Sequence, residues 1–342
     1  MHASVPEGII ADEVVAWLKQ YTPALTEPVT FDLIAGGHSN LTYSCSDAAG
    51  RKYVLRRPPL GHVLESAHDM GREYRIVSAL ADSAVPVAQT FGLSADAQVN
   101  GAPFFVMAYV DGVVVHDCDV AATLPAPQRQ QLATHLIEVL VALHRITPAD
   151  VGLDDLGRHD SYIARQLKRW TRQWLATTTH PIPAMEECSR LLAERMPEQI
   201  GTAIVHGDYR LGNFIVGEGR LRAVLDWELC TLGDPLADVG YLLNNWAGPD
   251  DTTPSLDDRS PTVAGGFPTR ADLSSQYAAA SGRDLTNINY YRAFQHWRLG
   301  AIRQGVYKRY LEGAMGSDTD FDLDVSKRAV ELCADAALEL LR

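Results

Sequence analysis

The chain changes character near Tyr109–Gly112, about one third of the way along. Before that point, short apolar runs separated by Gly and Pro surround a single helical pattern. After it, long helical patterns dominate. A strand-rich sequence followed by a helix-rich one predicts an α+β fold. We therefore expect a small strand-rich N-lobe over 1–109 and a larger helical C-lobe over 110–342, joined by a hinge.

Apolar periodicity predicts the individual elements. The N-lobe strands are expected at Val29–Ile34, Leu41–Cys45, Arg51–Arg57, Ala88–Leu93 and Phe104–Tyr109, with one helix at His68–Ala81. The C-lobe helices are expected around Leu132–His144 and at Tyr162–Ala176, Met185–Arg195, Leu236–Asn244, Asp272–Ser281, Tyr290–Leu311 and Val325–Leu341. Short C-lobe strands are expected at Ala203–His206, Phe214–Val216 and Leu221–Leu225. The long irregular stretch Asn245–Thr269 is typical of a lid or a specificity loop.

The overall charge excludes some classes of partner. A net charge of -13 argues against broad electrostatic binding to nucleic acid or to an anionic membrane. No apolar run reaches the ~20 residues that span a bilayer, and the N-terminus lacks the pattern of a signal peptide. These features predict a cytoplasmic protein. The five cysteines show no C-x-x-C spacing, so neither a disulfide framework nor a zinc site is expected.

The segment Ile204–Val216 carries the clearest chemical signal. Asp208 and Asn213 stand five positions apart on a polar loop between apolar strands, so both side chains can point into one cleft. The next apolar strand ends in Asp226. Phosphoryl transfer needs a carboxylate beside the attacking hydroxyl and magnesium to spread charge, and amide and carboxylate oxygens suit Mg²⁺. The alternative is a polar turn with an Asp at a helix cap.

This segment resembles the aminoglycoside/choline-kinase type of phosphotransferase, a distant relative of protein kinases. The H-G-D-x-x-x-x-N loop of that family and its following metal-binding Asp match His206–Asn213 and Asp226. The resemblance implies a bilobal protein-kinase-like fold with nucleotide binding in the N-lobe and catalysis and acceptor binding in the C-lobe. It also implies that Asp208 is the catalytic carboxylate, that Asn213 and Asp226 bind Mg²⁺, and that ATP is the phosphoryl donor.

Three more residues of this region are expected to support the loop. Asp234 followed by Pro235 is a natural helix start, N-cap and then N1, so Asp234 is predicted to be a structural cap. In the family, the Asp at the position of Asp238 helps to hold the catalytic loop. His206 is expected to be a buried support of the loop rather than a proton carrier.

A glycine-rich turn, Gly36-Gly37-His38-Ser39-Asn40, joins the first two predicted strands. Its backbone N–H groups and the Ser39 hydroxyl can cover the phosphates of ATP. Its place just before the third strand favours that role over an ordinary turn. Gly36, Gly37, Ser39 and Asn40 are therefore candidate nucleotide-binding residues.

The third predicted strand departs from the wider family. Arg56 stands where the resemblance places a phosphate-pairing lysine. Arginine is always charged and bidentate toward phosphate, so the role can survive with a different geometry. Its expected partner is Glu73 on the following helix, and the alternative is two unrelated surface charges. Arg56 and Glu73 complete the candidate nucleotide-binding set.

Nearly the whole chain, roughly 28–340, is similar to one branch of this family. The similarity is carried by VLRRPP, by the AHDMGREYR helix and by LDWELCTLGDPLADVGYLL. Members of the branch occur alone or fused ahead of acyl-CoA dehydrogenase domains, so such a dehydrogenase is an implied functional partner. The branch implies phosphorylation of a hydroxyl on an acyl chain, as in a hydroxyacyl-CoA.

The predicted helix Tyr290–Leu311 bears on the acceptor, because it is basic within an acidic protein. Its basic residues are Arg292, Arg298, Arg303, Lys308 and Arg309. Arg292, Arg303 and Tyr310 can share one face and Arg298 and Arg309 another. Such residues can meet a CoA phosphate, or they can form ion pairs on a solvated face.

Two alternatives remain open. A cationic acceptor, such as an aminoglycoside or choline, suits the acidic residues of the irregular stretch, which are Asp250, Asp251, Asp257 and Asp258. A pseudokinase that senses a nucleotide or binds a partner is the other alternative. Asp208, Asn213 and Asp226 argue against a pseudokinase, and Arg56 argues for it.

Overall fold

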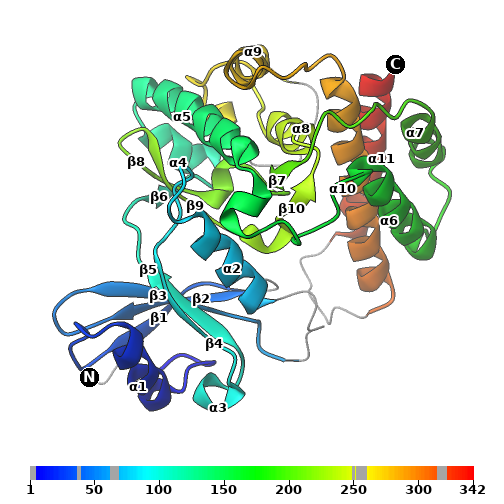
Figure 1. Ribbon diagram of the computed structural model, residues 1–342. Coiled ribbons are helices and arrows are strands. Elements are labelled where there is room, and N and C mark those ends of the chain that lie inside the picture. The colour runs from blue at the N-terminus through cyan, green and yellow to red at the C-terminus, as the bar shows by residue number, and fades with distance from the viewer. Residues whose placement is uncertain (1–4, 37–39, 62–68, 249–250, 252–259, 314–321) are drawn as a thin grey trace. The chain divides into compact units, whose positions relative to one another are not determined.

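The structure is a computed structural model that describes residues 5–36, 40–61, 69–248, 251, 260–313 and 322–342. It divides into two compact units (Figure 1). The first unit consists of Met1–Val113 with Arg222–Leu229, and the second of Val114–Leu221 with Cys230–Arg342. The first is built on a sheet and the second is mostly helical, so the predicted α+β class is confirmed.

A five-stranded antiparallel sheet forms the centre of the first unit. Its strands, in spatial order, are β1 (Thr30–Ala35), β2 (Leu41–Ser46), β3 (Lys52–Arg57), β5 (Phe104–Ala108) and β4 (Thr90–Ser94). All five lie within one or two residues of the predicted strands. The pairing of β3 with β5 places Leu55 opposite Val106 and Arg56 opposite Phe105, which fixes the face on which each side chain lies.

Both faces of this sheet are covered, because alternate side chains of β3 and β5 point to opposite sides. On one face Leu55 and Phe104 pack with α1 (Ala11–Tyr21), where the rings of Trp17 and Phe104 lie 4.9 Å apart. On the other face Phe105 packs against α2 (Met70–Leu80). The short helix α3 (Ala97–Asn100) precedes β5.

The helix α1 was not expected. Its buried residues Val14, Trp17 and Leu18 follow the i, i+3, i+4 spacing of one helix face. This spacing of apolar residues is the signal in the sequence that indicates the helix.

The second unit contains eight α-helices among its described residues. They are α4 (Cys118–Thr123), α5 (Ala126–Arg145), α6 (Tyr162–Thr177), α7 (Pro183–Glu194), α8 (Leu236–Asn244), α9 (Arg270–Ser281), α10 (Ile288–Leu311) and α11 (Leu323–Leu341). The strands β7 (Ala203–Val205) and β10 (Thr231–Gly233) form an antiparallel pair. A third sheet has the order β6 (Val113–Val114), β8 (Phe214–Gly217) and β9 (Arg220–Val224), and the unit boundaries at 113/114 and 221/222 fall within β6 and β9. No helix in the described part of the chain is long and apolar enough to cross a bilayer.

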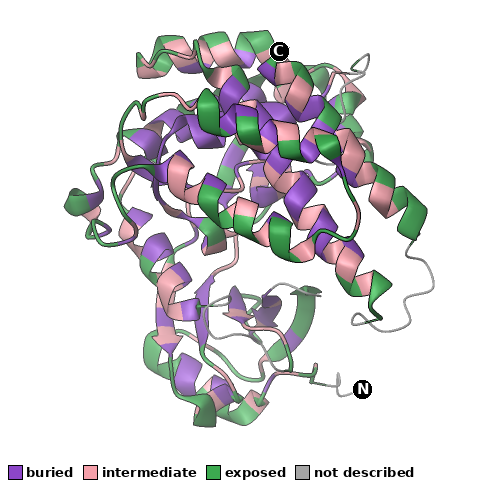
Figure 2. Cartoon of the chain, turned by 90° about the vertical axis from the view of Figure 1, so that its right-hand side faces the viewer, coloured by how far each residue is buried: buried purple, intermediate pink, exposed green. Residues whose placement is uncertain are grey.

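The helix α10 is the central element of the second unit. It packs against α6, α7, α8 and α11, and buried positions occur along most of its length (Figure 2). Trp297 and Phe294 are fully buried on it, and the Trp297 indole N–H donates to the main-chain oxygen of Met185 at 3.1 Å. Half of the 24 residues of this predicted basic helix are therefore core residues, and its charged residues occupy partly buried or exposed positions.

The helices α8 and α10 approach each other closely at Gly240. A Cβ atom at this position would lie 2.9 Å from the Cβ of Tyr291 and 3.0 Å from its main-chain carbon. Only glycine therefore allows this packing distance.

Replacing Gly240 with alanine tests this close approach. We expect Gly240→Ala to lower the free energy of unfolding by about 1–3 kcal/mol, as overpacking of a core does. Urea denaturation measures the change. The matched control is Gly305→Ala in α10, where the nearest atom would be 3.6 Å away, so the variant should be neutral or slightly more stable. Equal destabilisation of both variants would contradict the packing argument.

Candidate active site

The loop that carries Asp208 joins β7 to β8 in the second unit. Its first turn uses Gly207, whose φ of +84° is a conformation that favours glycine. Tyr209, the residue after Asp208, is fully buried and donates its hydroxyl hydrogen to the main-chain oxygen of Leu136 at 2.8 Å. Its ring also packs 4.7 Å from that of Phe214. Asp208 is thus held between a tight turn and an anchored aromatic residue.

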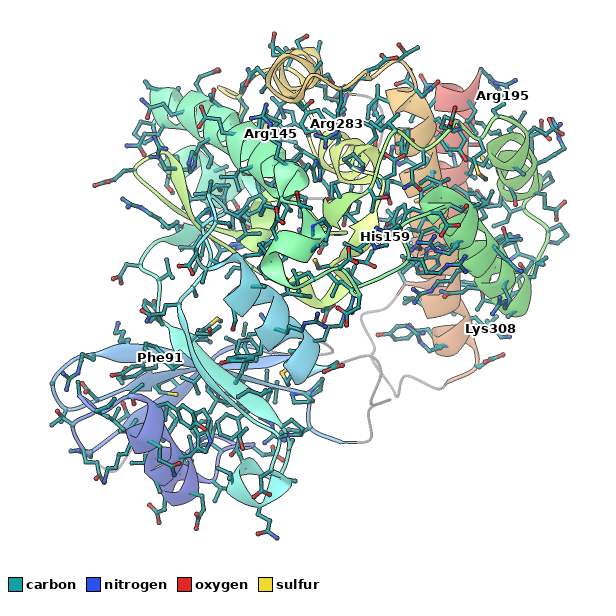
Figure 3. The ribbon with its side chains drawn as sticks, in the orientation of Figure 1. Phe91, Arg145, His159, Arg195, Arg283 and Lys308 are labelled. Atoms are coloured by element: carbon teal, nitrogen blue, oxygen red, sulfur yellow. The ribbon has the colours of Figure 1, made fainter. Side chains whose placement is uncertain are left out.

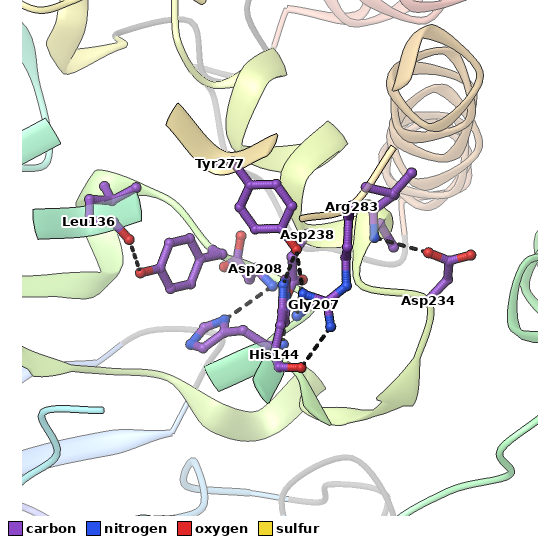
Figure 4. Close-up of polar contacts among 12 residues, drawn as sticks. Leu136, His144, Gly207, Asp208, Asp234, Asp238, Tyr277 and Arg283 are labelled. Carbon is purple, nitrogen blue, oxygen red and sulfur yellow. Dashed lines mark hydrogen bonds and ion pairs between the residues drawn. The ribbon is translucent and has the colours of Figure 1, made fainter. Parts of the chain in front are cut away.

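Asp238 on α8 holds the start of this loop (Figure 4). Its carboxylate accepts hydrogen bonds from the main-chain N–H groups of His206, at 2.7 Å, and Gly207, at 2.8 Å. His206 is fully buried, and its Nδ1 accepts from the main-chain N–H of Asp208 at 3.2 Å. Both support roles predicted from the sequence, for Asp238 and for His206, are confirmed by these contacts.

His144, at the end of α5, completes the support of Asp238. Its Nε2 lies 3.3 Å from the Asp238 carboxylate, and its Nδ1 lies 2.8 Å from the hydroxyl of Tyr277. Burial lowers the pKa of His144, so the ring is neutral, with Nε2–H as donor to Asp238. Burial alone would raise the pKa of Asp238, but the hydrogen bond from His144 and those from the loop outweigh it and leave that pKa below its usual range.

Asp208 and Asn213 lie in direct contact. The Nδ2 group of Asn213 donates to Oδ2 of Asp208 at 2.7 Å and to its main-chain oxygen at 2.8 Å. These bonds use the amide hydrogens of Asn213 and leave its Oδ1 as the group that can accept a metal ion. Arg210 Nε lies 3.4 Å from Oδ1 of Asp208. The structure therefore brings the predicted catalytic carboxylate and one predicted metal ligand together.

Tyr241 is a site residue that the sequence did not reveal. It lies on α8, three positions after Asp238, and its hydroxyl lies beside the carboxylate of Asp208. Burial and, second, the negative charge of Asp208 raise the pKa of Tyr241. Residues three apart on a helix lie on the same face, so the predicted role of Asp238 was the signal in the sequence that pointed to Tyr241. His144 had no such signal, because its contacts join segments distant in sequence.

Asp234 is more deeply embedded than a helix cap. The helix α8 begins at Leu236 with Pro235 as its N-cap, so the predicted assignment is shifted by one residue. The Asp234 carboxylate accepts from the Leu236 N–H at 3.0 Å and from the Tyr291 hydroxyl at 2.7 Å. It thereby ties the start of α8 to α10. Burial raises its pKa although these hydrogen bonds oppose the shift.

In the first unit, Arg56 and Glu73 form the predicted pair. Arg56 Nε lies 3.1 Å from Oε1 of Glu73, and both side chains are largely buried. The side-chain amide of Asn40 donates to Oε2 of the same carboxylate at 3.3 Å. Burial raises the pKa of Glu73, and the opposing charge of Arg56 reduces the shift. The alternative of two unrelated surface charges is wrong for this pair.

Asp226 also lies in the first unit, where its Oδ1 is 3.6 Å from Nη2 of Arg56. Its φ of +62° is an uncommon backbone conformation for a residue other than glycine, and such residues concentrate at functional sites. The structure thus brings Asp226, Arg56, Glu73 and Asn40 together in one unit.

The oxygen atoms of the Asn213 and Asp226 side chains suit a magnesium ion. No group of three or more His, Cys, Asp or Glu that could hold a metal occurs in the described parts of the chain. Mg²⁺ does not need such a cage, because it usually binds one or two protein oxygens together with phosphate oxygens and water. Asn213 Oδ1 and the Asp226 carboxylate are donors of that kind.

The glycine-rich turn is described only at its ends. Gly36 is its first residue, and a Cβ there would lie 2.8 Å from a methyl group of Leu41. Asn40 is its last residue and is buried against Glu73. Gly37 and Ser39, the other two candidate nucleotide-binding residues of the turn, lie outside the described residues.

Comparison with solved structures defines the class. A Ralstonia eutropha JMP134 protein that bears the provisional name aminoglycoside phosphotransferase superposes with a TM-score of 0.78 and 33% identity, over 96% of this chain and 98% of that one. A thermostable mutant of aminoglycoside phosphotransferase APH(4)-Ia, solved with AMP-PNP and hygromycin B, has a TM-score of 0.62 and 17% identity, over 95% and 98% of the two chains. The fold is therefore the protein-kinase-like fold of these phosphotransferases, as predicted.

The sequence comparisons define the family. The profile of the phosphotransferase enzyme family designated APH matches residues 30–272, so the chain belongs to this family and is a phosphotransferase. Acyl-CoA dehydrogenase family member 10 of Mus musculus is 37% identical over 92% of this chain, and family member 11 of Rattus norvegicus is 33% identical over 96%. The chain spans only 30% and 42% of the length of these two relatives.

The support of the loop predicts a pH dependence. The pKa of folded His144 lies below its ordinary value of 6.5, so its stabilising effect is complete above that pH and is lost as the pH falls toward the folded value. The loss is at most about 1.4 kcal/mol per pH unit. The depressed pKa of Asp238 acts in the same direction, but only near and below 3.8.

Urea denaturation of the wild type and of His144→Gln at pH 7 and pH 5 measures this effect. Glutamine can donate to Asp238 but does not titrate. The free energy of unfolding should therefore differ less between pH 7 and pH 5 in the variant than in the wild type. An unchanged difference would show that a neutral buried His144 is the wrong description.

Proposed function

We propose that the chain is an ATP- and Mg²⁺-dependent kinase that phosphorylates an alcohol hydroxyl. The observation that carries the proposal is the contact of Asp208 with Asn213 on a loop held by Asp238. Asp208 accepts the hydroxyl proton of the acceptor. The acceptor oxygen bonds to the γ-phosphorus as the bond from that phosphorus to the bridging oxygen breaks, and ADP leaves.

The remaining roles divide between the two regions expected from the sequence. In 1–109, Arg56 pairs with the phosphates and is oriented by Glu73, and the turn from Gly36 to Asn40 covers them. The region 110–342 carries the catalytic loop with Asp208 and binds the acceptor. A bound Mg²⁺, held by Asn213 and Asp226, would neutralise charge on the phosphates.

For the acceptor we propose a hydroxyacyl-CoA or a related acyl metabolite. The relatives named acyl-CoA dehydrogenase family members 10 and 11 support this choice, because phosphorylation turns a hydroxyl into a leaving group that acyl-chain catabolism can remove. An acyl-CoA dehydrogenase is the functional partner that this role suggests.

Two arginines that contact the end of α8, Arg270 and Arg292, support the choice of an anionic acceptor. Arg270 Nε donates to the main-chain oxygen of Leu243 at 2.9 Å, and Arg292 Nε donates to Oδ1 of Asn244 at 3.0 Å. Burial, followed by the nearby charge of Arg270, lowers the pKa of Arg292 to about 10. Of the four acidic residues that suggested a cationic acceptor, only Asp251 is described, and it is paired with Arg270 at 2.6 Å.

An aminoglycoside acceptor is the second candidate. It is favoured by the name of the Ralstonia eutropha protein, which is 33% identical over almost the whole chain. The discriminating experiment is an acceptor panel with Mg²⁺–ATP, in which ADP release is followed. We expect turnover with 4-hydroxyacyl-CoA. Turnover with aminoglycosides or choline alone would support the second candidate, and no turnover with any acceptor would support a pseudokinase.

Asp208→Asn tests the catalytic assignment. We expect kcat to fall about 10²–10⁴-fold, because the variant cannot accept the hydroxyl proton, while the affinity for ATP changes little. The control is Asp150→Asn, which alters an exposed aspartate and should keep the wild-type rate. A near-normal rate for Asp208→Asn would remove Asp208 from the mechanism.

Arg56→Met tests the nucleotide side of the site. Methionine fills a similar space without charge, so we expect KM for ATP to rise by at least about tenfold, as the loss of a charged hydrogen bond does. KM for ATP of Arg56→Lys should lie between the values of the wild type and of Arg56→Met, since lysine keeps the charge without the bidentate geometry. An unchanged KM for ATP in Arg56→Met would show that the pair with Glu73 is structural.

A further inference from the structure

Arg298, an arginine of the second unit, lies close to the candidate active site, and the residues that the structure describes give it no carboxylate partner. Arg298 lies on α10, a helix that packs against both α6 and α8. Its guanidinium lies 5.6 Å from the ring centre of Trp170 on α6 and 5.8 Å from that of Tyr241 on α8. These are the distances of cation–π contacts.

A buried glutamine sets the orientation of this guanidinium. Arg298 Nη1 donates to Oε1 of Gln295 at 3.0 Å, and Nε2 of Gln295 donates to the main-chain oxygen of Ala237 at 3.0 Å. Gln295 is only 3% exposed, so its position is fixed by the core. The Arg298 side chain is therefore held in one place before any ligand arrives, which reduces the entropy lost on binding.

Arg298 forms no ion pair with an Asp or Glu of the described part of the chain. Within the described residues no Asp or Glu oxygen lies within the 4.0 Å of an ion pair with Arg298. By contrast, Lys308 lies near the end of the same helix (Figure 3). It pairs with Glu312 at 3.7 Å and donates to the main-chain oxygen of Ala176. A half-buried cation without a counter-ion costs desolvation energy that a bound anion offsets.

Tyr241 connects this arginine to the reacting group. Its ring contacts the guanidinium of Arg298, and its hydroxyl lies beside the carboxylate of Asp208. All three residues belong to the second unit. Asp208 and the guanidinium of Arg298 are therefore separated by about the length of one tyrosine side chain. An acceptor whose hydroxyl lies at Asp208 can reach the positive charge of Arg298 with another of its groups.

We propose that Arg298 binds an anionic oxygen group of the acceptor, either a phosphate or a carboxylate, while the acceptor hydroxyl lies at Asp208. The assignment rests on the proposed kinase function and names the class of acceptor: a hydroxylated anion. A guanidinium presents several N–H donors in a plane that matches both groups. The same positive charge repels a polycation such as an aminoglycoside, so Arg298 also determines specificity.

The test compares the binding of three acceptors by calorimetry, in the presence of an unreactive ATP analogue and Mg²⁺. The acceptors are 4-hydroxyacyl-CoA, which carries phosphates; the free 4-hydroxy acid, which carries a carboxylate; and the 4-hydroxyacyl thioester of N-acetylcysteamine, which carries neither. The variants are Arg298→Met and, as a matched control, Arg169→Met. Arg169 is exposed on α6, with its guanidinium 5.3 Å from the same Trp170 ring.

In Arg298→Met, we expect Kd for at least one of the anionic acceptors to rise about 10–100-fold, as loss of a charged hydrogen bond does. Kd for the neutral thioester should stay the same. The anion that responds identifies phosphate or carboxylate as the bound group. Arg169→Met should bind all three as the wild type does.

Two results would overturn the proposal: equal weakening of all three acceptors, which indicates a structural role, or no change in any of them. Because binding is measured without turnover, failure of the kinase proposal appears separately. In that case the wild type would bind the anionic acceptor in an Arg298-dependent way but would not phosphorylate it when ATP is supplied.

Discussion

The arrangement of the second unit depends on one buried carboxylate. Asp238 accepts two main-chain N–H groups of the loop that begins at His206, and a neutral His144 donates to it from α5. Buried N–H groups without acceptors would be costly, so the loop keeps this shape as long as Asp238 stays ionised and in place. Asp208 is the next residue after Gly207, so the hydrogen bonds to Asp238 also fix the position of Asp208. The chemistry of the loop is therefore a consequence of α8, which carries Asp238, Tyr241 and the close contact at Gly240.

The first unit holds a second cluster of buried polar residues. Its buried Glu73 fixes Arg56, and Asp226 lies beside that arginine with a backbone conformation uncommon for its residue type. Under the proposed function, the groups of the first unit bind the phosphates and those of the second unit receive the acceptor hydroxyl. The chain belongs to a phosphotransferase family. The further proposal, that Arg298 binds the acceptor, narrows the acceptor to an anion.

Local patterns predicted much of this structure. The strands around the glycine-rich turn, the long helices and the spacing of Asp208 and Asn213 depend on residues close together in the chain, so their periodicity and motif were visible. The contacts of His144, Tyr241 and Arg298 were not, because they join α5, α8 and α10, which are far apart in sequence. The helix Tyr290–Leu311 shows the same limit: its charges were visible in the sequence, but its place at the centre of the second unit was not.

Transfer of a phosphoryl group from ATP to an alcohol hydroxyl at Asp208 is tested most directly by ³¹P NMR of the wild-type protein with ATP, Mg²⁺ and 4-hydroxyacyl-CoA. We expect the resonances of ADP and, growing in step with them, one new phosphomonoester resonance that is coupled to the proton on the hydroxyl-bearing carbon. A spectrum in which inorganic phosphate is the only new species besides ADP, or a spectrum that does not change, would show that no phosphoryl group is transferred to this hydroxyl.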